Sequence, residues 1–299
     1  MKPSRMRVMF VVLGATGKIG RATIGELRRQ GAPVRAIVRG PNSADDLSAM
    51  GCDVRVADIH DGEALGESMR GATAVQIICP TSIRADDAAA EMRNSIRTIV
   101  DALDRNRPSS VLAISDYGAH LASDTGITLT FHHLESELKK LPAALTFLRS
   151  AEHMENWSRL IGRAVETGVL PSLHHPVTKL FPTVSAPDVG VIAGELLLSG
   201  ARAPVSIIHA EGPDRYSVED VARTAGELVG RKITAREMSR PDWIPALVRG
   251  GLSASYAELV AAMYDAHNVG RIDVEPGVGD IRQGRTSLRE VLASITKTS

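Results

Sequence analysis

Three glycines near the amino end of the chain, Gly14, Gly17 and Gly20, have the spacing of a loop that binds a diphosphate group. The first would allow a tight turn, the second would let the backbone approach the phosphates, and the third would let a helix pack closely on a sheet. An apolar run precedes the loop and a helical pattern follows it, so N–H groups at the start of the helix would point at the phosphates. The expected dinucleotide contacts are Gly14, Ala15, Thr16, Gly17, Lys18, Ile19 and Gly20. The alternative is a glycine turn that serves packing alone.

The residues that end the next expected strands bear on which dinucleotide would bind. An NAD site usually has Asp or Glu at the end of the second strand, where the carboxylate binds the ribose 2′-hydroxyl. This sequence has Arg39 there and no acidic residue before Asp45. Because a guanidinium can pair with a 2′-phosphate, the pattern favours NADP(H) over NAD(H), with a solvated loop arginine as the alternative.

Two further strand ends are expected beside the cofactor. Asp58 follows the third strand and is a candidate partner for the adenine amino group, with a helix cap as the alternative. The fourth strand ends in Ile78, Cys79 and Pro80, which should lie against the cofactor ribose. No base is near Cys79 in the sequence, so we interpret its thiol as a small apolar filler rather than a nucleophile.

The composition excludes several function classes. The 299 residues include 35 basic and 35 acidic side chains and are 43% hydrophobic, which is typical of a folded protein and unlike a disordered chain. The balanced charge argues against a nucleic-acid binder that works through bulk charge, and no apolar run approaches the ~18 residues of a membrane span. We therefore expect neither a nucleic-acid nor a membrane partner.

The cysteine and histidine content predicts a cytoplasmic protein without a metal site. The chain has two cysteines, Cys52 and Cys79, and no Cys/His cluster with metal-ligand spacing. Two adjacent histidines rarely share one metal, so we interpret His174 and His175 as part of a surface loop.

Alternating strand and helix patterns must position these candidates. In the first half, apolar strand-like runs at 7–13, 33–38, 53–57, 73–78, 110–115 and 144–149 alternate with helical patterns at 18–30, 43–50, 61–69, 84–105 and 132–140. This alternation predicts an α/β fold, a Rossmann-like doubly wound parallel sheet with a smaller C-terminal substrate lobe. Tyr117 follows the fifth strand, where it would either form a wall of the substrate pocket or pack within a loop.

The second half of the chain is less regular. Helices are expected at 151–166, 189–198, 217–229, 242–248, 253–264 and 287–295, short strands at 179–184, 205–209 and 232–237, and a loop at 270–284. We therefore predict an NAD(P)-binding domain over residues 1–150. Residues 151–299 are expected to complete the sheet and to form a small substrate-facing lobe.

The sequence resembles the NmrA-like branch of the atypical short-chain dehydrogenase/reductases. The shared pattern comprises the glycine loop at 14–20, Val38-Arg39, Ala57-Asp58, and Phe147-Leu148-Arg149 followed by Glu155-Asn156. Within that branch it is most similar to NADPH-dependent quinone reductases and triphenylmethane-dye reductases, whose His-x-x-x-Glu segment matches residues 133–137. The resemblance implies a Rossmann-like nucleotide domain, a small C-terminal lobe, and a substrate in the cleft between them.

The resemblance also implies roles for individual residues. It places His133 over the nicotinamide as an acid or substrate-orienting group, with a polar histidine near a helix start as the alternative. It places Met154, Asn156 and Trp157 at substrate contacts, with core packing as the alternative for the Met/Trp pair. The implied substrate is a small aromatic or quinone-like molecule, and a homodimer is compatible with the sequence.

One departure from the classical relatives narrows the chemistry. Those enzymes use a Tyr-x-x-x-Lys pair, whereas none of Tyr117, Tyr216, Tyr256 and Tyr264 has a lysine four residues on. Hydride transfer to an electron-poor quinone or dye does not need that pair, because water or a histidine can supply the proton. We expect an NAD(P)H-dependent oxidoreductase that reduces a conjugated acceptor. The alternative is a non-catalytic NADP(H)-binding redox sensor that acts through a protein partner.

Overall fold

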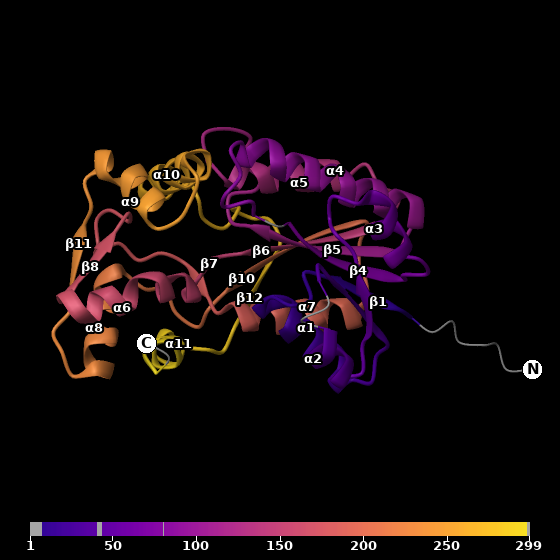
Figure 1. The fold of residues 1–299 in the computed structure, drawn as a ribbon, viewed down its shortest axis with the longest axis horizontal. Helices are drawn as coiled ribbons and strands as arrows, with labels where there is room; N and C mark the ends of the chain where they lie inside the picture. The colour runs from indigo at the N-terminus through magenta and orange to yellow at the C-terminus, as the bar shows by residue number, and fades with distance from the viewer. Residues whose placement is uncertain (1–7, 41–43, 80, 298–299) are drawn as a thin grey trace, which may run out of the picture.

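An eight-stranded parallel sheet runs through the centre of the molecule in the order β12–β10–β6–β5–β4–β1–β2–β3 (Figure 1). The computed structural model describes residues 8–40, 44–79 and 81–297. The strands are β1 (Phe10–Leu13), β2 (Val34–Val38), β3 (Asp53–Val56), β4 (Ala74–Ile78), β5 (Ser110–Asp116), β6 (Ala144–Ser150), β10 (Val205–Glu211) and β12 (Asp280–Gln283). All neighbouring strands pair in parallel, which confirms the predicted Rossmann-like α/β fold.

Helices cover both faces of this sheet (Figure 1). One face carries α1 (Lys18–Arg29), α2 (Ala44–Ala49) and α7 (Ala186–Ser199), and the other carries α3 (Gly62–Ser68), α4 (Ala88–Asn106) and α5 (Thr128–Leu138). Successive strand residues point to opposite faces, so Val12 and Ala36 pack under α1 while Val11 and Ile37 pack under α4. Strands buried on both faces explain the continuous apolar runs of the first half.

Helix α7 holds α1 in place through an unusually close approach. A Cβ atom on Gly190 of α7 would lie 2.3 Å from the carbonyl oxygen of Ile19, so the two helices could not pack this closely with a larger residue. At the same crossing the Thr23 hydroxyl donates to the carbonyl oxygen of Gly190 at 3.0 Å. Residues of the second half of the chain therefore support the helix that follows the glycine loop.

The remaining elements form a lobe beyond the carboxyl ends of the strands (Figure 1). They are the helices α6 (Ser158–Thr167), α8 (Val218–Val229), α9 (Trp243–Arg249), α10 (Ala254–Asn268) and α11 (Leu288–Thr296), the short helices η2 (Met154–Trp157) and η3 (Arg240–Asp242), and the short strands β7 (Glu152–His153), β8 (Val169–Ser172), β9 (Thr183–Val184) and β11 (Thr234–Glu237). A separate core joins α6, α8 and α11. In the described part of the chain, no helix combines the length and hydropathy of a bilayer span.

Two expected elements of the second half are wrong. Residues 152–157 form β7 and η2 instead of the first turns of a helix, because Glu152 and His153 pair with β9. The expected loop at 270–284 contains β12, which pairs with β10 at the edge of the sheet. All four β12 residues are exposed, so the segment lacks the apolar alternation that marks a strand.

Candidate functional site

The glycine loop has the geometry that the sequence predicts. Strand β1 is buried along its whole length, and the residue that follows it, Gly14, has a φ of +73°, which lies in the region that favours glycine. Helix α1 begins four residues later, at Lys18. A Cβ atom on Gly20 would lie 2.3 Å from the carbonyl oxygen of Gly14, so this third glycine is required for the helix to pack on the loop.

The amino end of α1 lacks the side-chain cap that α3, α4, α8, α10 and α11 have. Gly17 is its N-cap and provides no side-chain hydrogen bond, and its first turn holds no acidic residue. By contrast, Asp or Ser side chains cap α3, α4, α8, α10 and α11. Uncapped N–H groups at a helix N-terminus form a binding site for an anion.

The surface beside Gly17 also has room for a phosphate. Gly17 is exposed, and a Cβ atom built there would meet only the Gly14 carbonyl oxygen, at 3.5 Å. Glycine is therefore not needed at this position for the fold itself, whereas a bound diphosphate would need it. The residues of the loop thus fit the dinucleotide phosphates that the sequence predicts.

The charged residues expected around the dinucleotide end the neighbouring strands. Arg39 follows β2, is exposed, and has no ion pair with any described residue. The carboxylate of Asp58 accepts the backbone N–H of His60 at 2.9 Å. The cap of α3 is Asp61, which accepts from Glu63 and Ala64, so the cap alternative for Asp58 is wrong.

The end of β4 borders the glycine loop. The Ile78 side chain packs against Gly14, with Cδ1 3.3 Å from where a Cβ would stand. Cys79 is 4% exposed, and burial raises the pKa of its thiol to about 12. A protonated, buried thiol matches the interpretation of Cys79 as an apolar filler. Pro80, the third expected contact on this strand end, lies outside the described residues.

The residues assigned to substrate contacts occupy different environments. Tyr117 is 1% exposed, and its hydroxyl donates to Glu211 Oε1 at 3.1 Å. Met154 is fully buried, and Trp157 packs in the same core as Met154. Packing therefore accounts for these three side chains, which leaves Asn156 as the exposed member of the set.

The structure does not bring His133 to the carboxyl edge of the sheet. On α5, Thr128 and Glu135 share the inner face and bond the end of β5. His133 lies roughly 160° around the helix from Glu135. Its side chain is 38% exposed, with Glu137 4.0 Å away. The neighbouring His132 donates from Nδ1 to the carbonyl oxygen of Ala119. The alternative of a polar surface histidine therefore describes His133.

Sequence reasoning missed a buried charged cluster at the ends of β5 and β6. Arg149 and Glu135 are each 2% exposed and form two hydrogen bonds of 2.8 Å, from Nε and Nη2. Ser115 also donates to Glu135, at 2.7 Å, and Glu275 pairs with Arg149 from the opposite side. Burial disfavours the Arg149 charge, but the two carboxylates outweigh it and raise the pKa of Arg149. The family motif that contains Arg149 thus has a structural role in this chain.

Glu155, from the same motif, caps helix α7. Its Oε2 accepts the backbone N–H of Ala186 at 2.9 Å, and its Oε1 accepts the Ser185 hydroxyl at 3.1 Å. These bonds satisfy donors at the start of α7, and α7 in turn packs on α1. Glu155 therefore links the segment after β6 to the helix of the glycine loop.

A second buried cluster shows that His174 does not lie in a surface loop. His174 is 3% exposed, stacks on Phe181 at 3.8 Å between ring centroids, and lies 2.9 Å from Glu152. The Tyr264 hydroxyl donates to Glu152 as well. Burial raises the pKa of Glu152, but its interactions with His174, His267 and Tyr264 together outweigh burial and lower this pKa to about 2. Within the described residues, no three His, Cys, Asp or Glu side chains are grouped as metal ligands.

Asp116 is the last residue of β5 and lies at the carboxyl edge of the sheet. Its Oδ2 accepts the Thr128 hydroxyl at 2.8 Å. Burial raises the pKa of Asp116 to about 7, and the Thr128 hydrogen bond lowers it by less. Acidic groups with pKa values near neutrality gather at functional sites, so Asp116 joins the candidates.

An Asp116→Asn variant should remove a pH-dependent loss of stability. The folded pKa lies above the usual 3.8, so the native carboxyl holds its proton to higher pH than the unfolded one. Stability should therefore fall as the pH rises from about 4 to 7 and stay low above that. Asn keeps an acceptor for Thr128, so the variant should gain on the order of 2 kcal/mol over wild type at pH 8. Urea unfolding at pH 5 and pH 8 measures this, and a pH-independent difference would contradict it.

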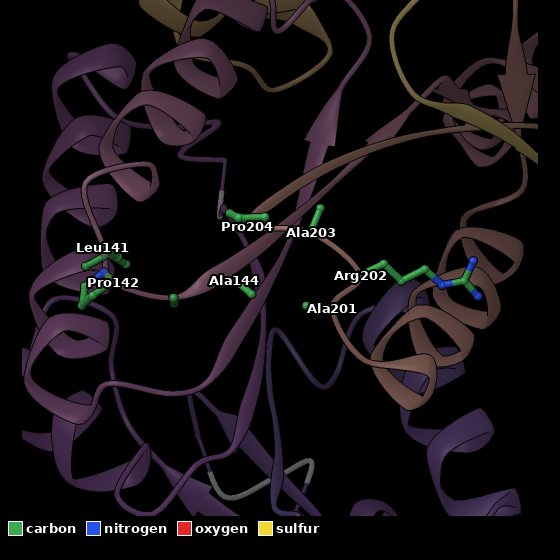
Figure 2. A pocket seen from close by; sticks show the side chains of 8 residues that line it. Leu141, Pro142, Ala144, Ala201, Arg202, Ala203 and Pro204 are labelled. Atoms are coloured by element: carbon green, nitrogen blue, oxygen red, sulfur yellow. The ribbon is translucent and has the colours of Figure 1, made fainter.

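Two surface hollows lie away from this edge. Figure 2 shows one of about 600 Å³, lined by residues 141–144 and 201–204 at the amino ends of β6 and β10. Another, of about 670 Å³, lies between α3 and the end of α4. Ligands of open α/β sheets bind beyond the carboxyl ends of the strands. The candidate site is therefore the carboxyl edge from β1 to β6, and neither hollow belongs to it.

Known proteins resemble this chain in sequence and in fold. Residues 14–156 match a family model described as NAD(P)H-binding. Quinone oxidoreductase 2 of Escherichia coli is 27% identical over 268 residues, which cover 85% of this chain and 86% of that protein. Its crystal structure with NADPH aligns with a TM-score of 0.81 at 21% identity, over 96% of this chain and 100% of that one.

Two other solved structures share the fold. Triphenylmethane reductase of Citrobacter sp. aligns with a TM-score of 0.80 at 19% identity, over 97% of this chain and 99% of that one. A double mutant of NmrA aligns with a TM-score of 0.72 at 15% identity, over 98% of this chain and 92% of that one. The resemblance to NmrA-like quinone and dye reductases that the sequence predicts is thereby confirmed.

Proposed function

We propose that this chain, whose sequence and fold resemble those of NmrA-like quinone and dye reductases, is an NADPH-dependent reductase of a conjugated acceptor such as a quinone or dye. The observation that carries the proposal is the uncapped amino end of α1 beside an exposed Gly17. The NAD(P)H-binding match over 14–156 and the quinone oxidoreductase relative support it independently.

Different residues of the chain would bind different parts of the dinucleotide. The backbone N–H groups of residues 18–20 would hold the diphosphate, and Lys18 would add positive charge. Arg39 would pair with the 2′-phosphate, and Asp58 would accept from the adenine amino group. Ile78 and Cys79 would form an apolar wall beside the ribose. When bound, the reduced nicotinamide supplies a hydride.

The acceptor would lie between the carboxyl edge of the sheet and the lobe. Residues 1–150 form the nucleotide-binding part in this proposal, and 151–299 add β10 and β12 and face the substrate. Asn156 is exposed after β6 and stays a candidate contact. His133 has no part in the proposal, because it lies on the side of α5 opposite Glu135, which bonds the end of β5. We expect a His133→Ala variant to behave as the wild type.

The direct test is a fluorescence titration with NADPH and NADH, followed by an assay of the tighter one against quinones and triphenylmethane dyes. Steady oxidation of NADPH with at least one acceptor would support the reductase. Tight binding of both NADPH and NADP⁺ without turnover across the panel would contradict it and favour the sensor. The absence of dinucleotide binding would overturn both.

An Arg39→Glu variant should bind NADPH about 10- to 100-fold more weakly, because a charge-assisted bond to the 2′-phosphate becomes a repulsion. NADH lacks that phosphate, so its dissociation constant should change by less than about threefold. The matched control is Arg97→Glu, an equal charge change at an exposed residue of α4. An unchanged preference for NADPH in Arg39→Glu would show that Arg39 is not the selector.

A further inference from the structure

The first turn of α10 is fastened to the segment that follows β4. The backbone N–H of Ser253 donates to the carbonyl oxygen of Ile83 at 2.8 Å, and the Ser255 hydroxyl accepts from the N–H of Ala88 at 3.1 Å. Tyr256 comes next, is 9% exposed, and packs in the same core as Cys79. The lobe thus places a tyrosine over the strand end that the cofactor is expected to contact.

The hydroxyl of Tyr256 is surrounded by polar groups from other elements. Thr81 hydrogen-bonds it, and Asp116 and Cys79, at the ends of β5 and β4, are near enough to act on it electrostatically. Burial is the largest influence and raises the pKa of Tyr256. The hydroxyl therefore keeps its proton at neutral pH, which makes it a hydrogen-bond donor rather than a base.

Arg159 supplies a positive charge to the same region. It is exposed in the first turn of α6 and has no ion pair with a described residue, unlike Arg149 and Arg215. Its charge acts on Tyr256 and also on Tyr264. These tyrosines are eight residues, or ~12 Å, apart along α10. Arg159, which follows the end of β6, therefore lies near the stretch of α10 that carries both tyrosines.

We propose that Tyr256 and Arg159 form the acceptor side of the site and select a conjugated carbonyl compound with an anionic substituent. Tyr256 donates a hydrogen bond to the carbonyl oxygen on which negative charge develops, and Arg159 binds the carboxylate, sulfonate or phosphate. The proposal rests on the proposed reductase function.

The electrons and protons of this reduction balance. The acceptor gains two electrons and one proton as the hydride from NADPH, which becomes NADP⁺. A second proton, from solvent, then completes the reduced acceptor at the oxygen that Tyr256 holds. Tyr256 itself ends the cycle protonated, so no further reactant is required.

A pair of acceptors that differ in charge tests the Arg159 half. We expect wild type to reduce 1,4-naphthoquinone-2-sulfonate with a kcat/KM at least about 10-fold above that for 1,4-naphthoquinone. The matched control is Arg163→Ala, which removes an exposed cation one turn further along α6 and should keep the wild-type ratio of the two quinones. Arg159→Ala should raise KM for the sulfonate about 10-fold and leave the neutral quinone within twofold. Equal effects on both quinones, or none, would overturn this half.

A Tyr256→Phe variant tests the other half, because it removes the hydroxyl and keeps the ring in the core. We expect kcat to fall roughly 100-fold with both quinones while KM and the melting temperature stay close to wild type. Wild-type turnover by Tyr256→Phe would overturn the role of the hydroxyl.

A binding measurement separates this proposal from the proposed function. Calorimetry with NADP⁺-loaded protein should show the sulfonate binding to wild type and Arg163→Ala, and at least about 10-fold more weakly to Arg159→Ala. If wild type turns over neither quinone but binds the sulfonate in this way, the reductase function fails and the anion site stands. If calorimetry shows no dependence on Arg159, the anion site fails whatever the activity.

Discussion

A Gly17→Val variant is expected to fold as the wild type does and to bind NADPH at least about 100-fold more weakly. The backbone at Gly17 has a φ of −73°, which any residue adopts, and a Cβ there meets only one atom, at 3.5 Å. The valine methyl groups would instead occupy the space of the diphosphate and cost two or more charge-assisted hydrogen bonds of about 1.5–3 kcal/mol each. Fluorescence titration with NADPH, beside a urea unfolding curve, measures both quantities.

Two other glycines of α1 serve as references for this variant. Gly25→Ala changes a helical position with no neighbour within 4 Å, so binding should be unchanged. Gly20→Val should fail to fold normally, since its Cβ would stand 2.3 Å from the Gly14 oxygen. Wild-type affinity in a folded Gly17→Val protein would mean that the diphosphate does not lie on this loop.

The fold of the first half follows from the sequence because its strands are buried on both faces. The run 10–13 is apolar throughout and the run 74–78 is apolar except for Gln76, and both stand between helices with clear caps or glycine stops. The edge strand β12 carries Asp280, Arg282 and Gln283, and its pairing with β10 is invisible in such a pattern. Strand β7 is also not visible in the sequence pattern, because its two residues are extended only through their pairing with β9.

Some parts of the candidate site can be predicted from the sequence and others cannot. The glycine loop is made of residues that are close together in the sequence, so the sequence alone predicts it. The resemblance places His133 over the nicotinamide. The helical pattern itself does not predict which face of α5 meets the sheet, because the helix has few strongly apolar positions. Tyr256 lies 175 residues beyond Thr81, and its place over β4 depends on how the lobe folds back, which no local spacing encodes.

The pairing of Arg149 with two carboxylates is also beyond sequence reasoning, because Glu135 and Glu275 lie on opposite sides of it in the chain. The resemblance identifies Arg149 only as part of a family motif, whereas its role in this structure is to hold α5 and the segment before β12 to the end of β6. The buried Arg149 guanidinium donates three hydrogen bonds to carboxylates. Burying such a charge costs free energy, but removing one partner of the buried ion pair costs more.

An Arg149→Met variant should therefore lose about 3–5 kcal/mol of unfolding free energy, because Glu135 keeps its 2% exposure without a counter-charge. Ser115 still donates a hydrogen bond to Glu135, but this bond does not neutralise the carboxylate charge.

The control is Arg223→Met, whose exposed pairs with Asp220 and Glu227 are worth less than about 1 kcal/mol. In the double variant Arg149→Met/Glu135→Gln the buried charge is gone, so part of the loss should return, and urea unfolding of the four proteins measures it. A single variant as stable as Arg223→Met, or a double variant less stable than Arg149→Met alone, would show that the cluster does not carry a buried charge pair.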